Sequence, residues 1–342
     1  MVNQRAVSIE DIARVAGVSH STVSRALRNN PLISLDMRER IQVLAREMNY
    51  VPNEIAQSLQ MKRSKTIGLV VTSVADPFFG EVVRGVEEVA QAANLSVLLN
   101  ASHNDADREF TAIETFQRRR VDGIIVADAR LSSDYKTKPV QIKVPTILIN
   151  SQAEDQSDAF NFVGIEDSFG ARLAVEHLLQ LGHRRIGYLG LGNRPRSNHL
   201  RLAGYMAAMS AAGLEPLDEL VVIAGPGNLR HEDDANVGQE LLPRLLAAGV
   251  TAVFCYNDML AVGALVACRE LGLKVPGDLS LVGFDDIALA KYVTPPLTTI
   301  HQPMFDLGRS AMEMLLDLLD QKEVENKVLQ PYLVTRQSSA PL

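Results

Sequence analysis

The stretch SIEDIARVAGVSHSTVSRAL, residues 8–27, contains two short helix signals separated by a glycine. Ser8 precedes an apolar pattern at helical spacing and has an acidic residue three positions later, which is a variant of the capping box. Gly17 interrupts the pattern, as glycine does at helix C-termini, and Ser19 can cap a second helix. A third apolar stripe over residues 34–49 completes three predicted helices, the first two joined by a tight turn as in a helix-turn-helix unit.

The second helix has one apolar side and one side of short polar side chains. Val23, Ala26 and Leu27 share the apolar side, so the polar residues turn outward. Small hydrogen-bonding side chains near the start of a recognition helix can reach base edges, and an arginine can bind a guanine through O6 and N7. Hydroxyl groups beside them suit phosphate contacts. The residues predicted to bind DNA in this helix are Ser19, His20, Ser21, Thr22, Ser24 and Arg25.

The net charge of −7 argues against nucleic-acid binding until its distribution is considered. Residues 1–65 contain 10 Lys and Arg against 6 Asp and Glu, whereas residues 66–342 contain 24 against 35. A basic head on an acidic body indicates that only the head meets a polyanion. The alternative is chance unevenness of surface charge.

Residues 51–65 predict a hinge segment between head and body. Asn53 can cap a helix of about two turns, which is marginal alone in water and would form when DNA and a partner copy hold it. Leu59 would be exposed at the end of that helix, where an apolar side chain can insert between base steps in the minor groove. The alternative is a plain linker with an incidental leucine.

From Thr66 onward, apolar runs such as IGLVV, GIIVA, TILIN and AVFCY alternate with helical stretches. Strands of this kind predict parallel sheets with helices on both faces. We therefore predict an all-α helix-turn-helix head (1–50), the hinge (51–65) and an α/β body (66–342) of two doubly wound lobes. A new strand-helix-strand unit begins near Phe162, where we place the boundary between the lobes.

Ligands of such sheets bind beyond the carboxyl ends of the strands, between the lobes. Polar groups follow four apolar strands here: Asp76, Asn150, Asn257 with Asp258, and Asp285 with Asp286. Carboxylates and amides in such places suit sugar hydroxyls, and Phe78 or Phe79 could stack on an apolar sugar face. For Asp258 we favour the simpler role of capping the next helix.

The sequence gives little support to an enzyme. It contains no GxSxG elbow, no Walker-type phosphate loop and no metal-ligand spacing of Cys, His and Glu, and the GxG of GYLGLGN does not complete a dinucleotide fingerprint. His183 stands alone, and we interpret it as structural. We predict no catalytic residue, no metal and no cofactor.

No apolar run approaches the roughly 18 residues of a membrane helix, and no signal-peptide core is found near the start. Cys255 and Cys268 form no CxxC motif, which is typical of reduced thiols. We expect a cytoplasmic protein without a membrane partner. A solute-binding protein would need an export signal and would have no use for a basic head.

The segment SIEDIARVAGVSHSTVSRAL, followed by RIQVLAREMNYVPNEIAQSL, closely resembles the DNA-binding head of the LacI–GalR family of bacterial transcription regulators. The likeness continues through KTIGLVV, ADPFF, VEHLLQLGHRRIGYLG, LRLAGY, YNDMLAVGAL, LSLVGFDD and PPLTTIHQP, over essentially the whole chain. The resemblance implies that His20, Ser21 and Arg25 read bases and that Leu59 intercalates at the operator centre. It also implies a nucleoid-associated homodimer on a near-palindromic operator.

The resemblance further implies discontinuous lobes of the periplasmic sugar-binding fold. We assign residues of about 66–161 and 290–325 to the first lobe, and about 162–289 and 326–342 to the second. Arg201 and Asp285 match ligand-binding positions of the family, and Arg196 and Ser197 are placed in the loop before Arg201. The chain stops without a heptad tail, so we expect a dimer rather than a tetramer. The predicted effector-binding residues are Asp76, Phe78, Phe79, Asn150, Arg196, Ser197, Arg201, Asn257 and Asp285.

The family implies an effector that is a sugar, a sugar phosphate, or a purine or nucleoside. The acids and amides at the strand ends favour a carbohydrate, whereas Arg194 and Arg196 beside Arg201 could favour a phosphate or carboxylate. The stretch GPGNLRHEDD lacks the aromatic that relatives place there. We expect a repressor whose effector shifts the lobes and so decides whether two hinge helices pair. Whether the effector releases DNA or promotes binding stays open.

Overall fold

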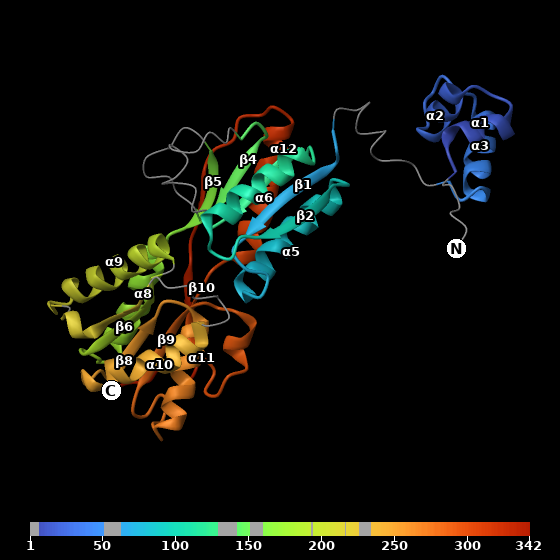
Figure 1. The fold of residues 1–342 in the computed structure, drawn as a ribbon. Helices are drawn as coiled ribbons and strands as arrows, with labels where there is room; N and C mark the ends of the chain where they lie inside the picture. Colours follow the sequence, from blue (N-terminus) through green and yellow to red (C-terminus); the bar gives the residue numbers. More distant parts are fainter. Residues whose placement is uncertain are drawn as a thin grey trace. The chain divides into compact units, whose positions relative to one another are not determined.

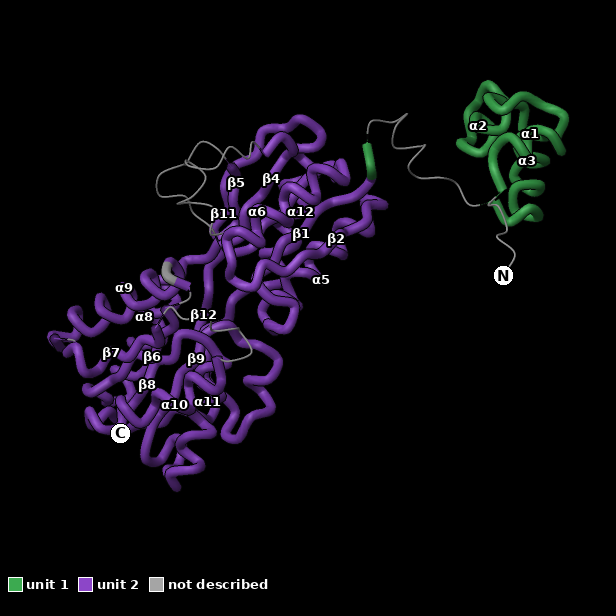
Figure 2. Tube along the Cα trace, in the orientation of Figure 1, with its two compact units in different colours: residues 1–64 green, residues 65–342 purple. Residues whose placement is uncertain are grey.

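The computed structural model of the 342-residue chain describes residues 7–50, 63–128, 142–150, 160–192, 194–215, 217–225 and 234–342. The chain divides into two compact units, Met1–Ser64 and Lys65–Leu342 (Figure 2). Within the described ranges, no helix is both long and apolar enough to cross a membrane.

The first unit is the predicted helix-turn-helix head, with helices α1 (Ile9–Ala16), α2 (His20–Leu27) and α3 (Leu35–Glu47). Ser8 and Asp11 form a reciprocal capping box at the start of α1. Gly17 ends α1 with a left-handed φ of 69°, a conformation that glycine adopts without steric cost. The three helices enclose a small core of Ile12, Ala13, Ala16, Val23, Ala26, Ile41 and Ala45.

The body contains two six-stranded sheets, each covered by helices on both faces (Figure 1). The first sheet has the order β11-β5-β4-β3-β1-β2, and all its strand pairs are parallel. Its strands are β1 (Thr66–Val71), β2 (Ser96–Ala101), β3 (Gly123–Ala127), β4 (Thr146–Ile149), β5 (Asn161–Ile165) and β11 (Lys327–Leu329).

Alternation of side chains along β1 explains how the first sheet is covered. Ile67, Leu69 and Val71 point to a core shared with α5 (Pro77–Ala92) and α12 (Met304–Leu319). Val70 points to the opposite core, shared with α6 (Ala106–Arg118). Continuous apolar runs are therefore needed in the central strands, as the sequence predicts.

The second sheet has the order β12-β10-β9-β8-β6-β7 and is parallel except for β12, which pairs antiparallel with β10. Its strands are β6 (Ile186–Leu191), β7 (Val221–Ala224), β8 (Ala252–Cys255), β9 (Ser280–Asp285), β10 (Thr298–His301) and β12 (Tyr332–Val334). Helices α8 (Asp167–Gln180) and α9 (Pro195–Ala211) pack together, as do α10 (Asp234–Ala247) and α11 (Asp258–Glu270). Short 3₁₀ helices occupy Asp218–Leu220 and Ala288–Lys291.

The strand pairings differ from the predicted lobe boundaries in three places. Strand β5 belongs to the first sheet, so the chain leaves this lobe after Ile165 rather than near Phe162. Strand β10 belongs to the second sheet, and the return therefore follows His301 and not residue 290. Strand β11 lies in the first sheet, beyond the predicted boundary at residue 326. Periodicity locates strands but does not reveal the neighbour with which each one pairs, which explains the error.

Candidate DNA-binding and effector sites

The outward face of α2 carries the predicted DNA-binding side chains. His20, Ser21 and Arg25 are exposed, and Thr22 and Ser24 are partly exposed. Val23 and Ala26 face the core of the head, as the apolar pattern predicts.

Ser19 has a structural task in addition to any contact with DNA. Its Oγ accepts a hydrogen bond from the backbone N–H of Thr22 (3.1 Å) and so caps α2. The same Oγ lies 2.8 Å from both Ser21 Oγ and Thr22 Oγ1. These hydroxyl groups therefore form a connected polar cluster at the start of the helix. Asn53 and Leu59, the two hinge residues predicted to meet DNA, lie outside the described residues.

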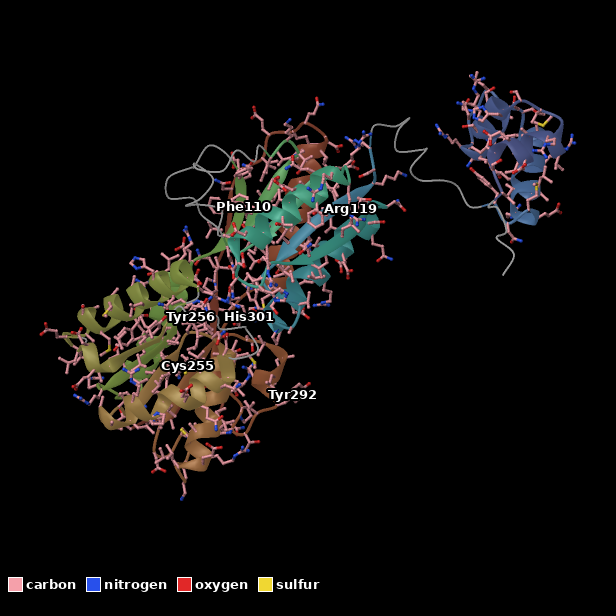
Figure 3. The ribbon with its side chains drawn as sticks, in the orientation of Figure 1. Phe110, Arg119, Cys255, Tyr256, Tyr292 and His301 are labelled. Atoms are coloured by element: carbon pink, nitrogen blue, oxygen red, sulfur yellow. The ribbon has the colours of Figure 1, made fainter. Side chains whose placement is uncertain are left out.

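In the body, polar side chains gather at the carboxyl ends of both sheets. Asp76, Asp128 and Asn150 follow β1, β3 and β4 of the first sheet, and Asp167 follows β5. Strands β6, β8 and β9 of the second sheet lead to Arg194, Tyr256 with Asn257, and Asp285. Hydrogen bonds and ion pairs connect the two groups directly, and Figure 3 labels Tyr256 at this junction of the lobes.

Arg201, on α9, is the centre of the buried network. Its Nε donates to Asp167 Oδ1 (2.8 Å), its Nη1 donates to the carbonyl of Tyr256, and Asp285 Oδ1 lies 3.6 Å from Nη1. The guanidinium carbon also lies over the rings of Tyr256 (4.4 Å) and Phe284 (3.7 Å). Burial alone would lower the pKa of Arg201, but the neighbouring carboxylates raise it. Arg201 is therefore a fixed, buried cation.

Asp285 stands at the end of β9 in an unusual backbone conformation, with φ at 120°. Its carboxylate accepts a hydrogen bond from Gln302 Nε2 and faces Arg201. Burial raises the pKa of Asp285 well above its usual range, although Arg201 opposes this shift. The contacts with Gln302 and Arg201 thus hold the Asp285 side chain in place at the strand end, as is required of ligand-binding groups.

Arg194 joins the two lobes. This residue follows β6 of the second lobe, and its Nη2 donates to Asp76 Oδ2 of the first lobe at 2.9 Å. Its Nη1 lies 4.0 Å from Asp128 Oδ2. Burial raises the pKa of Asp128 to about 6, while Arg194 acts in the opposite direction. The pair of Arg194 and Asp76 is almost fully buried, so opening it without a new partner would leave uncompensated charge in the interior.

Several predicted effector residues have a different local setting from the one we expected. Arg196 and Ser197 lie in the first turn of α9, because the helix begins at Pro195 and not after a loop. Ser197 Oγ is 2.6 Å from the hydroxyl of Tyr256. Arg196 is partly buried.

Phe78 and Phe79 are both buried, with 4% and 1% of their surface exposed, and their rings meet edge to face. They belong to the core between the first sheet and its helices. Neither ring is therefore an exposed stacking face of the kind expected for a sugar. The apolar faces of α5 and the sheet need these side chains for packing.

Asn257, and not Asp258, caps α11. Its Oδ1 accepts from the N–H of Leu260 (2.8 Å), and its Nδ2 donates to Asp234 (2.8 Å). Asp258 instead accepts from Thr299 Oγ1 and from the N–H of Ile287 (2.9 Å), and it thereby connects α11 to β10. The expectation that Asp258 caps the helix was wrong because the cap lies one residue earlier.

Three buried oxygens at the strand ends have no hydrogen-bond partner among the described residues. They are Asn150 Oδ1, Thr72 Oγ1 and Gln302 Oε1. Arg194 Nε is likewise without an acceptor in this part of the chain. Buried polar atoms are nearly always satisfied, so such a group of orphans indicates a place where a polar ligand or water binds.

The sequence pattern missed the roles of Asp128, Asp167 and Tyr256 in this network. Asp128 directly follows the strand GIIVA, Asp167 lies two positions after NFVGI, and Tyr256 follows AVFC. The rule that identified Asp76 and Asn150 would therefore have found them too. The pairing of Arg201 with Asp167 could not be predicted from the sequence, because it depends on how α8 and α9 pack against each other.

Family comparisons agree with this two-part architecture. Residues 8–53 match the model of bacterial regulatory proteins of the lacI family, and residues 175–339 match a periplasmic binding protein-like domain. The chain is 36% identical over 341 residues to the HTH-type transcriptional regulator GalR of Escherichia coli K12, covering 97% of this chain and 95% of that protein.

Solved structures have the same fold. A lac repressor dimer bound to operator and the anti-inducer ONPF has a TM-score of 0.86, with 30% identity, covering 98% of this chain and 100% of that one. A LacI family regulator from Enterococcus faecium with bound ribose has a TM-score of 0.71 and 32% identity, covering 81% of this chain and 99% of that one.

The chain belongs to the LacI family of bacterial regulatory proteins. It is a DNA-binding transcriptional regulator that carries an effector-binding domain of periplasmic-binding-protein fold.

Proposed function

We propose that the protein is a repressor that binds a near-palindromic operator as a homodimer and is controlled by a carbohydrate held between its lobes. The observation that supports a carbohydrate effector is the acidic character of the buried junction between the lobes. Among the described residues there, the carboxylates of Asp76, Asp128, Asp167 and Asp285 contact or closely approach the guanidinium groups of Arg194 and Arg201. We place the protein in the cytoplasm, associated with the nucleoid.

On the DNA side, His20, Ser21 and Arg25 of each protomer read base edges, and Ser19, Thr22 and Ser24 contact phosphates or neighbouring bases. Their exposure on one face of α2 supports this assignment. For the hinge, we propose that Asn53 contacts DNA and that Leu59 inserts at the operator centre. The lac repressor structure, a dimer on its operator, supports the dimeric arrangement.

On the effector side, the chemistry of the junction favours neutral hydroxyl groups. Carboxylate oxygens accept hydrogen bonds from hydroxyls, and the unpaired oxygens of Asn150, Thr72 and Gln302 offer further acceptors. Asp76, Asn150, Ser197, Arg201, Asn257 and Asp285 line or support this site, with Arg196 at its edge. The ribose-bound relative supports a carbohydrate.

The same geometry disfavours a phosphate-bearing effector. Arg194 and Arg201 already pair with carboxylates, so a phosphate would have to displace buried acids or share the site with them. A purine or nucleoside would need a flat ring to stack on, but Phe78 and Phe79 belong to the core and Arg201 covers Tyr256 and Phe284.

The effector acts through the relative position of the lobes. A ligand hydroxyl that binds Asp76 competes with Arg194 and so alters the contact between the lobes. A change of this kind in the dimer decides whether the two hinge helices can pair on DNA. Coupling between two sites is commonly about 1–3 kcal/mol and is reciprocal, so operator DNA changes effector affinity by the same factor.

The test is the thermal melting shift of the purified protein with a panel of sugars, sugar phosphates, purines and nucleosides. A ligand that binds only the folded state raises the melting temperature. We expect a shift with one neutral sugar and a matching change in operator affinity. A shift with only a nucleoside or phosphorylated compound would overturn the proposed effector class, and unchanged operator affinity would overturn its regulatory role.

A further inference from the structure

The acidic body contains a run of three arginines at residues 118–120. Helix α6 ends at Arg118, Arg119 caps it, and Arg120 follows with a left-handed φ of 57°. All three side chains are exposed. Arg118 contacts Thr115 and lies 3.6 Å from Glu114, whereas no described residue forms an ion pair or side-chain hydrogen bond with Arg119 or Arg120.

These arginines lie at the amino ends of the first sheet, together with two lysines. The backbone N–H of Lys65, just before β1, donates to Asp122 Oδ2 (2.8 Å), and that of Asp122 donates to the carbonyl of Thr66 (2.8 Å). The backbone N–H of Lys143, before β4, donates to Gln117 Oε1 (3.3 Å). Figure 3 labels Arg119 on this lobe. We refer to Lys65, Arg118, Arg119, Arg120 and Lys143 as the basic collar.

The basic collar lies at the end of the first sheet at which the chain enters the body. Lys65 lies only six positions after Leu59. An extended chain of that length spans at most about 20 Å. If Leu59 inserts at the operator centre, as proposed above, Lys65 of the basic collar is tethered within about that distance of the central phosphates, and the rest of the collar lies at the same end of the sheet.

The basic collar is a positively charged region on a body whose net charge is negative. It groups five cations around Glu114 and Asp122, and Asp122 is already bonded to the backbone of Lys65. Residues 66–342 as a whole carry 11 more acids than bases. Duplex DNA carries one negative charge per roughly 1.7 Å of its axis, so it complements such a cluster.

We propose that the basic collar binds operator phosphates on either side of the hinge insertion site, so that the body itself contributes to DNA affinity. The inference rests on the proposed hinge position. The contacts neutralise phosphates and read no bases, so they strengthen binding to all sequences similarly and make it depend on salt.

The test compares Arg119→Gln/Arg120→Gln with the wild-type protein on a duplex selected in vitro by the wild-type protein. Operator affinity is measured over a series of salt concentrations. Each lost phosphate contact reduces the slope of log K against log salt by about 0.9. A dimer with one lost contact per protomer should therefore show a slope smaller by about 2, with affinity more than tenfold lower at low salt.

The matched control is Arg244→Gln/Lys274→Gln, which removes the same charge from two exposed sites on the second lobe. It should bind with the wild-type slope. Phosphate-ethylation interference should show central phosphates that matter for the wild type and the control but not for the collar variant.

The outcomes separate the two levels of the proposal. If the wild-type protein selects no operator, the proposed function fails. If it selects one and the collar variant has the same slope and interference pattern as the control, the proposed function stands and the collar has no role in DNA binding. Melting curves that match the wild type exclude a folding defect as the cause of weaker binding.

Discussion

The head and the body place their functional residues in opposite environments. The proposed reading residues His20, Ser21 and Arg25 come from six consecutive positions on one helix and are all exposed. The residues of the lobe junction are spread from Asp76 to Asp285, and most of them are buried. An exposed local face can change its specificity with little effect on folding, whereas a buried network ties ligand binding to stability.

The largest expected effect is at Arg201, where a substitution tests whether ligand binding and stability depend on the same buried network. In Arg201→Met, the carboxylates of Asp167 and Asp285 remain buried without their cation. Removing one partner of a buried ion pair typically costs about 3–5 kcal/mol, and we expect a loss of unfolding free energy in that range together with loss of effector response. Chemical denaturation measures the first and operator release the second. Arg244→Met is the exposed control, and equal stability of the two variants would contradict the buried network.

The second prediction concerns the head, at Arg25. Because this side chain is exposed and does not belong to the core, Arg25→Ala should change the free energy of unfolding by no more than about 0.5 kcal/mol. Its loss should reduce discrimination at one base pair of each half-site by roughly 1–3 kcal/mol, measured by competition between selected and substituted operators. Effector binding should be unaffected. Undiminished discrimination would remove Arg25 from the reading face.

The smallest expected effect is a pH dependence of stability caused by Asp128 in the buried lobe junction. Burial raises the pKa of Asp128 to about 6, above its value in the unfolded chain, so the folded state binds more protons. This group therefore lowers stability as pH rises from about 4 to about 6 and leaves a constant cost above that range. Asp128→Asn should remove this cost. The shift in pKa sets an upper limit of about 3 kcal/mol on the gain in stability at pH 7, and we expect about 1 kcal/mol because water reaches part of this carboxylate.

Denaturation of both proteins at pH 4.5, 6 and 7.5 is the measurement for Asp128. The gain should shrink toward pH 4.5, where the native carboxyl is protonated but the unfolded one is still largely ionised, and it should disappear only below about pH 4. Asp122→Asn serves as the control, because Asp122 is a partly exposed carboxylate of the same lobe. A gain that is equal at all three values would mean that Asp128 does not titrate in this range.

Local sequence signals determined a large part of this protein. The capping box at Ser8, the left-handed Gly17 and the apolar side of α2 fixed the head, because helix ends and helix faces depend on residues only a few positions apart. The apolar runs of the body predicted the strands for the same reason. The rule about strand ends reached Asp76, Asn150 and Asp285, and applied consistently it would have reached Asp128 and Asp167.

Only the tertiary structure decided which strands share a sheet and which charges share a site. Strands β5, β10 and β11 lie in lobes that periodicity did not assign to them, because pairing depends on partners more than a hundred residues away in the case of β5 and β11. The ion pairs of Arg194 with Asp76 and of Arg201 with Asp167 have the same origin. Phe78 and Phe79 face the core because packing against α12 and the sheet buries them, and no property of the residues themselves reveals that direction.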